Sequence, residues 1–134
     1  MQARFGASEF ATDECRVVIS PIASARVLVV FEGRDRGGLG REPFNALESH
    51  LSGADSVDLF FDLERAGGAS LDVSGSWALW LRANRVRLRR VGMLTGSAFV
   101  ALSARTVERF AGLGSKARIY ADRASFERDL NRPS

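Results

Sequence analysis

The chain has 134 residues, of which 46% are apolar and 26% are charged, and its formal net charge is +3. This length and composition predict one soluble globular domain that is large enough to bury its own core. The chain contains no low-complexity segment, and no apolar run approaches the ~20 residues that a membrane-spanning helix needs.

The scarcity of cysteine and histidine narrows the chemistry further. Cys15 is the only cysteine and His50 the only histidine, so we expect no internal disulfide and no metal site built from these residues. The start of the chain contains acids and lacks the apolar centre of a signal peptide, which predicts a cytoplasmic protein. The basic residues are, apart from Lys116, arginines spread among acids, and this pattern argues against a nucleic-acid partner.

The amino-terminal part of the chain predicts a flexible arm followed by an antiparallel strand pair. Residues 1–14 show no apolar period and mix small, polar and acidic side chains, as flexible arms do. β-Branched runs over 16–20 and 26–32 predict two strands, and the short segment between them indicates a hairpin. A turn rich in glycine and arginine follows over 33–40.

The next element is a predicted helix with a clear start and a single apolar stripe. Pro43 suits an early helical position, where its missing N–H costs nothing. Phe44, Leu47 and Leu51 follow at intervals that place them on one face. Gly53 is a typical helix stop, so we expect the helix to end before it.

The remainder of the chain alternates strands with helices. The apolar run 57–63 is bounded by charges, which is typical of a strand that is buried on both faces. The elements expected after it are a helix carrying Trp77 and Trp80, a strand over 86–95, a helix over 98–111 with Phe99, Leu102, Thr106 and Phe110 on its apolar stripe, a strand over 117–120 and a last helix capped by Asp122.

This element order, ββαβαβαβα, predicts an α/β fold with a mixed, mostly parallel sheet. Strands that are joined by helical crossovers run parallel, and the crossovers are right-handed. The first two strands form an antiparallel pair beside them. We expect the flexible arm to precede a single domain over residues 15–131, without internal repeats.

Polar residues and glycines gather where the strand 57–63 ends and the next helix begins. Open α/β sheets usually keep their binding sites outside the carboxyl ends of the parallel strands. Asp62 lies at that end of its strand, and Gly67 and Gly68 lie in a connection that we expect to be flexible. Residues 72–75 read Asp-Val-Ser-Gly at a helix start. We therefore expect the functional site at this edge of the sheet.

The element order and the Asp-Val-Ser-Gly motif after an acid-ended strand together resemble the STAS domains, the group of anti-sigma-factor antagonists. The carboxy-terminal half is similar to a bacterial branch called SpoIIAA-like. There an arginine-bearing strand, a helix beginning near Ser97, a short strand and a terminal helix like residues 121–130 recur in this order. The resemblance covers residues 16–130 and implies a STAS-like fold.

The resemblance also implies a regulatory role through protein contact. In STAS domains the helix-start motif is an acid, two hydroxyl residues and a glycine, and a partner kinase phosphorylates the hydroxyl next to the glycine. Phosphorylation switches binding to that kinase or to an anti-sigma factor, so partners of these kinds are implied. Val73 replaces the first hydroxyl here. The residues expected to bind a partner are Asp62, Gly67, Gly68, Asp72, Ser74 and Gly75, with Ser74 as the phosphorylation site.

The same residues leave a purely structural interpretation open, in which Ser70, Asp72 or Ser74 only caps the helix. No set of residues assembles a catalytic site, because Ser74 lacks the Gly-x-Ser-x-Gly context of hydrolases. Asp62 and Asp72 can approach each other at the sheet edge, but acids in a loop are more often solvated than catalytic. The glycine clusters form neither a phosphate loop nor a dinucleotide motif. We therefore predict a non-enzymatic protein without a cofactor.

A second interpretation is a carrier of a small apolar ligand or lipid. The SpoIIAA-like branch resembles a lipid-binding fold, and the helices bearing Trp77, Trp80, Phe99 and Phe110 can part around an apolar molecule. A cavity lined by these aromatic residues favours the carrier, whereas a dense core with an exposed polar helix start favours the partner-binding module. An exposed apolar patch favours a homodimer.

Overall fold

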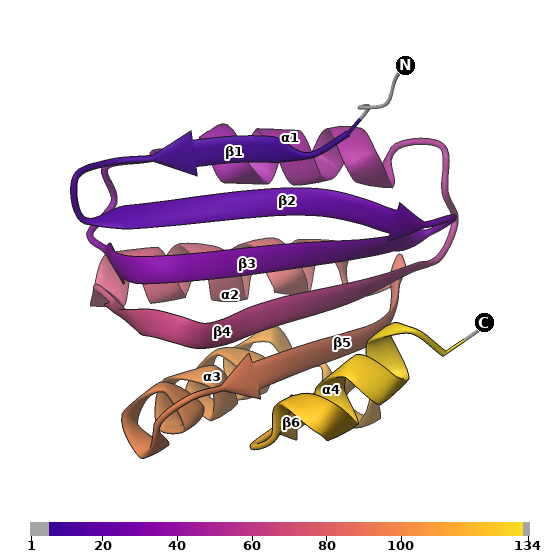
Figure 1. Cartoon of the computed structure of the whole chain (residues 1–134). Coiled ribbons are helices and arrows are strands. Elements are labelled where there is room, and N and C mark those ends of the chain that lie inside the picture. Colours follow the sequence, from indigo (N-terminus) through magenta and orange to yellow (C-terminus); the bar gives the residue numbers. More distant parts are fainter. Residues whose placement is uncertain (1–5, 133–134) are drawn as a thin grey trace.

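The computed structural model describes residues 6–132, which form one six-stranded sheet and four α-helices (Figure 1). The strands are β1 (Ser8–Ala11), β2 (Cys15–Ala23), β3 (Arg26–Asp35), β4 (Val57–Ala69), β5 (Leu88–Thr95) and β6 (Ala117–Tyr120). The helices are α1 (Glu42–Leu51), α2 (Leu71–Asn84), α3 (Ala98–Ala111) and α4 (Arg123–Leu130), with a short 3-10 turn at Gly114–Lys116.

The strands lie side by side in the order in which they occur in the sequence. β1 and β3 both pair antiparallel with β2, and the pairs β3–β4, β4–β5 and β5–β6 are parallel. The predicted α/β fold with a mixed, mostly parallel sheet is therefore confirmed. Asp122 caps α4 as expected, since its carboxylate accepts a hydrogen bond of 2.8 Å from the amide of Ser125.

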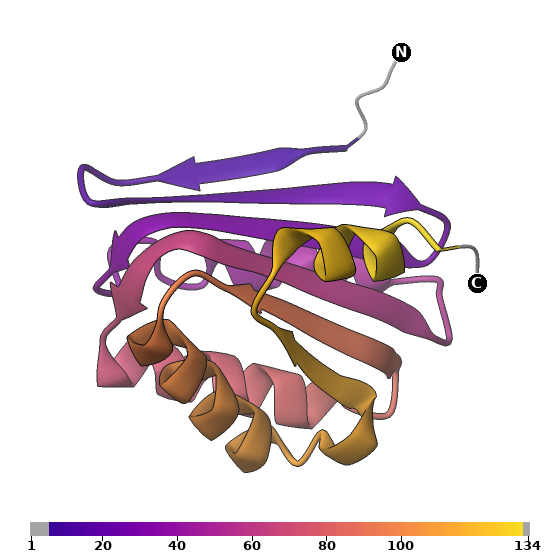
Figure 2. The same ribbon diagram turned by 60° about the horizontal axis from the view of Figure 1, so that its bottom comes forward.

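Helices cover the two faces of the sheet unequally. α1, α2 and α3 pack on one face and bury the larger core, whereas α4 lies alone on the other face (Figures 1 and 2). Under α4 a smaller core joins residues of three strands to the helix: Phe60, Leu94, Tyr120, Phe126 and Leu130. No helix among residues 6–132 is long and apolar enough to cross a membrane.

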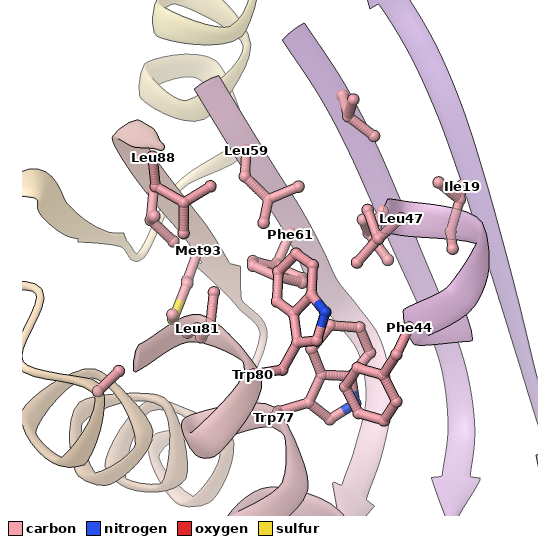
Figure 3. Close-up of a cluster of buried hydrophobic side chains, with 14 of the residues drawn as sticks. Ile19, Phe44, Leu47, Leu59, Phe61, Trp77, Trp80, Leu81, Leu88 and Met93 are labelled. Carbon is pink, nitrogen blue, oxygen red and sulfur yellow. The ribbon is translucent and has the colours of Figure 1, made fainter. Parts of the chain in front are cut away.

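Both tryptophans belong to the larger core. The ring of Trp77 lies between α2 and the sheet, with its centroid 4.5 Å from that of Phe44 and 5.5 Å from that of Phe61 (Figure 3). Trp80 packs beside it and donates a hydrogen bond of 3.1 Å from its indole nitrogen to the carboxylate of Glu48 on α1. These rings fix α1 and α2 against the strands.

The amino-terminal segment differs from the predicted flexible arm. Residues 1–5 lie outside the described residues, but Ser8–Ala11 forms β1 and pairs with β2 over its whole length. The side chain of Phe10 packs against the larger core, opposite Val17. A strand of four residues is too short to show a period in the sequence, and pairing with β2 supplies the hydrogen bonds that hold it.

The third helix also differs from its prediction, because the expected apolar stripe faces outward. Phe99, Leu102 and Phe110 are 64%, 63% and 68% exposed, whereas Val100 and Ala104 are buried. Small side chains on the inner side allow α3 to approach both α2 and the sheet closely. The large residues therefore lie on the outer surface.

A buried carboxylate joins four elements at the amino-terminal end of the parallel strands. Asp58 on β4 is 0% exposed and forms ion pairs with Arg26 at 3.2 Å, Arg89 at 2.6 Å and Arg90 at 2.8 Å. Arg26 on β3 also donates a hydrogen bond of 2.9 Å to the carbonyl oxygen of Leu130, at the end of α4. Burial by itself would raise the pKa of Asp58, but hydrogen bonds from Arg89 and Arg90 hold it well below its usual range.

Replacing this carboxylate tests how much it stabilises the fold. We expect Asp58→Asn to lower the free energy of unfolding at pH 7 by about 3 kcal/mol, because it leaves buried arginine charge uncompensated. Urea denaturation measures the change. The matched control is Asp55→Asn, on an exposed residue nearby, which we expect to change stability by less than about 0.5 kcal/mol.

The ion pairs of Asp58 also predict that the stability of the fold depends on pH. The pKa of Asp58 is lower in the folded chain than its unfolded value of about 3.9, so its stabilisation is present above that pH and is lost as the pH falls below it. The wild type should therefore lose more stability than Asp58→Asn between pH 5 and pH 3. Equal losses in the two proteins would contradict this assignment.

Candidate functional site

The start of α2 lies beside the carboxyl ends of β3 and β4, where the sequence places the functional site. Ser70 is the N-cap, because its hydroxyl oxygen accepts a hydrogen bond of 3.2 Å from the amide of Val73. The amide of Ser70 donates to the carbonyl oxygen of Asp35 at 3.0 Å and so ties the helix start to the end of β3. Of the three cap candidates, the structure selects Ser70.

The first turn of α2 stands out from the surface. Leu71 is 92% exposed, which is unusual for a large apolar residue, and Asp72 is also exposed. A side-chain carbon added at Gly75 would meet nothing within 4 Å outside its own helix. This turn therefore offers an apolar side chain, an acid and accessible backbone to a partner.

Ser74 lies on the inner side of the same turn. It is half-buried, and its amide already donates to the carbonyl oxygen of Ser70 at 2.9 Å. The free amides at the helix start precede it, so a group attached to Ser74 lies next to them and not directly on the helix axis. Ser74 also contributes to the wall of a cavity.

That cavity lies between α2, α3 and the sheet and has a volume of about 100 Å³. Most of its wall is apolar. Phe31, Phe61 and Met93 line it from the strands, Trp77 from α2 and Val107 from α3. The polar residues in its lining are Glu32, Asp35, Ser74 and Ser103. Of the four aromatic residues that the carrier interpretation places around such a space, Trp77 lines it, whereas Trp80, Phe99 and Phe110 do not.

The glycine connection is not the flexible loop that the sequence predicts. β4 continues through Gly67 and Gly68 to Ala69, and this extension pairs in parallel with the end of β3. Gly68 adopts a φ of +114°, and a side-chain carbon built there would lie 3.1 Å from the ring of Phe99. The glycines are needed because the ribbon bulges at this place and α3 lies against it.

Asp62 is separated from the other predicted site residues. Phe61 packs against the helices on one face of the sheet, so the alternation of a strand points Asp62 to the opposite face. There its carboxylate binds Arg123 of α4 at 2.8 Å, and the same guanidinium binds Glu64 at 2.6 Å. These hydrogen bonds raise the pKa of Arg123. The expectation that Asp62 and Asp72 can meet is therefore wrong.

Arg123 and its partners border a second, polar cleft of about 290 Å³ on the α4 face. Its walls are Val30, Glu32, Asp62, Glu64, Arg65 and Arg123. Each acid of this group has an arginine within salt-bridge distance, so the cleft is lined by a network of ion pairs. It holds α4 to the edge of the sheet.

Comparison with known proteins identifies the fold. No protein-family model matches the sequence, and no curated protein matches it significantly. A solved structure that resembles it is an uncharacterised protein of the DUF3478 family with a SpoIIAA-like fold, from Shewanella loihica PV-4. The TM-score is 0.62 and the identity 13%, over 97% of this chain and 98% of that one.

A second similar structure is the anti-sigma-factor antagonist SpoIIAA in its unphosphorylated form. The TM-score is 0.52 and the sequence identity 15%, over 88% of this chain and 99% of SpoIIAA. At sequence identities this low, the structural similarity establishes a shared fold and no more. The chain therefore has the SpoIIAA-like fold of STAS domains, as the resemblance in sequence implies.

Proposed function

We propose that this protein is a non-enzymatic regulatory module that binds a protein partner through the start of α2. The observation that carries the proposal is the exposed first turn, where Leu71 is 92% exposed beside Asp72. An apolar side chain with an adjacent charge, on a rigid helix end, is suited to anchor a protein contact. The fold supports the proposal, since SpoIIAA is an anti-sigma-factor antagonist. A cytoplasmic kinase or an anti-sigma-factor-like protein is the proposed partner.

Ser74 is the proposed switch of this contact. A phosphate adds a charge of about −1.5 to −2 at neutral pH, and such a charge is costly to hold against the apolar wall of the cavity. The phosphorylated side chain would have to turn toward solvent, where the neighbouring carboxylate of Asp72 repels it. Modification would therefore reshape the first turn of α2 and change the surface that a partner meets.

A pull-down from native lysate with wild type, Ser74→Ala and Ser74→Glu tests the proposal. We expect one partner whose recovery falls or rises with Ser74→Glu, because the added charge alters the first turn. Intact mass should also show a species heavier by about 80 Da, the phosphate mass, on wild type and not on Ser74→Ala.

Ser76→Glu is the matched control, because Ser76 is an exposed serine two residues further along the same helix. It adds the same charge outside the cavity and should leave partner recovery unchanged. Thermal unfolding of every variant checks that the fold is retained. The same partners for all four proteins, without the heavier species, would refute the Ser74 switch and leave a constitutive binding module.

The cavity supports a second candidate function, the binding of a small apolar ligand. Its volume of about 100 Å³ is close to that of an engineered apolar cavity of about 150 Å³ that binds benzene. Trp77 forms part of its wall and reports on its occupancy. A longer lipid chain fits only if α2 and α3 move apart.

Filling the cavity tests this candidate. We expect toluene to raise the unfolding temperature of wild type and to change the fluorescence of Trp77, because it replaces empty space with contacts. Ala104→Leu should abolish both effects, since Ala104 is buried in the cavity wall. Ala83→Leu, on an exposed alanine of α2, is the control and should retain them. An identical toluene response in Ala104→Leu would exclude the cavity as the binding place.

A further inference from the structure

Large exposed apolar side chains lie on α2, on α3 and in the turn after α2. We call the surface of these elements the outer helix surface and define its apolar part by Leu79, Val86, Phe99, Leu102 and Phe110. Each of these residues is between 63% and 86% exposed. α2 and α3 lie side by side on the outside of the molecule (Figure 2), and Val86 lies in the turn that follows α2.

Arginines lie among these apolar residues without carboxylate partners. Arg82, Arg85, Arg105 and Arg109 are exposed, and none of them forms a salt bridge with any residue between 6 and 132. The guanidinium of Arg82 donates a hydrogen bond of 3.4 Å to the carbonyl oxygen of Phe110. These arginines can therefore bind an anion from outside the chain.

The opposite side of the sheet is organised differently. There Arg118 pairs with Asp129 at 2.9 Å, and Arg123 pairs with Asp62 and Glu64. The only acids on α2 and α3 are Asp72, at the far amino-terminal end of α2, and Glu108, which is half-buried. Arg118 and Arg123 on the α4 side are thus paired with carboxylates, whereas the exposed arginines of α2 and α3 form no salt bridge within residues 6–132.

We propose that the outer helix surface docks on an anionic lipid bilayer. Apolar side chains insert into the boundary between headgroups and acyl chains, while the arginines bind lipid phosphates and carboxylates. The two helices would lie in the plane of the membrane.

Other occupants fit this surface less well. A nucleic acid would bind the arginines but leave Leu102 and Phe110 in water. A second copy of the chain that packs α3 against α3 would bring the arginines of the two copies together, where they repel each other. The bilayer satisfies both kinds of side chain.

The proposal goes beyond the regulatory function and does not depend on Ser74. It concerns residues of α3 that do not line the cavity. Attachment would be peripheral, by two short helices. Membrane binding and partner binding therefore use different residues, and the variants that test one leave the other intact.

Vesicle flotation with the purified chain tests the proposal. We expect binding to vesicles of phosphatidylcholine with about 30% phosphatidylserine and little binding to phosphatidylcholine alone, with release at about 0.5 M salt. Arg105→Gln with Arg109→Gln should weaken binding about thirtyfold, from the loss of two basic residues near an anionic surface. Leu102→Ser with Phe110→Ser should weaken binding to the same vesicles even at low salt.

Arg65→Gln with Arg128→Gln is the matched control, because it removes the same charge from exposed residues outside the outer helix surface. If binding depends on where the arginines lie and not on net charge, this variant should bind the anionic vesicles within about twofold of wild type. Absence of binding to anionic vesicles, equal binding to neutral ones, or an equal loss in this control would overturn the proposal. Light scattering would show whether the chain forms a dimer instead. A dimer that Leu102→Ser with Phe110→Ser dissociates, in a protein that does not bind vesicles, would assign the surface to a second copy of the chain.

Discussion

The buried carboxylate of Asp58 is the constraint on which the arrangement of this fold depends. It lies on the central strand β4 at 0% exposure, and its three arginine partners come from both neighbouring strands. Through Arg26 it also reaches the last turn of α4. A buried ion costs much desolvation unless it is paired, so burial of Asp58 requires that these elements keep its arginine partners in place.

On the α4 face, Arg123 binds Asp62 and Glu64 at the other end of the parallel strands. There β3 and β4 leave the sheet as a bulged ribbon, α2 begins with an exposed turn, and a cavity remains beneath the two outer helices. This end is therefore held by ion pairs on the α4 face and is open to contact on the face that α2 and α3 cover. Ser74 lies where the exposed turn and the cavity meet, which is why we assign it the role of the switch.

Much of the fold could be predicted because its strands and helices differ clearly in period. The bounds of the helix over 98–111 were predicted correctly, but the side that faces the core was not. The small residues Val100 and Ala104 face the core, and the larger aromatic residues Phe99 and Phe110 are exposed. The side of Asp62 was predictable in principle from strand alternation. The continuation of β4 through Gly68 was not, since it depends on pairing with β3 and on the ring of Phe99.

The central claim is that the first turn of α2 and the cavity beneath it form one switchable site. Amide hydrogen exchange of Ser74→Glu, compared with wild type and Ser76→Glu, tests it most directly. We predict that Ser74→Glu exchanges faster than wild type only in the first turns of α2 and the facing part of α3, and that its protection around Asp58 is unchanged. Ser76→Glu should show the same exchange as wild type. Unchanged exchange in Ser74→Glu, or an equal change in both variants, would contradict the claim.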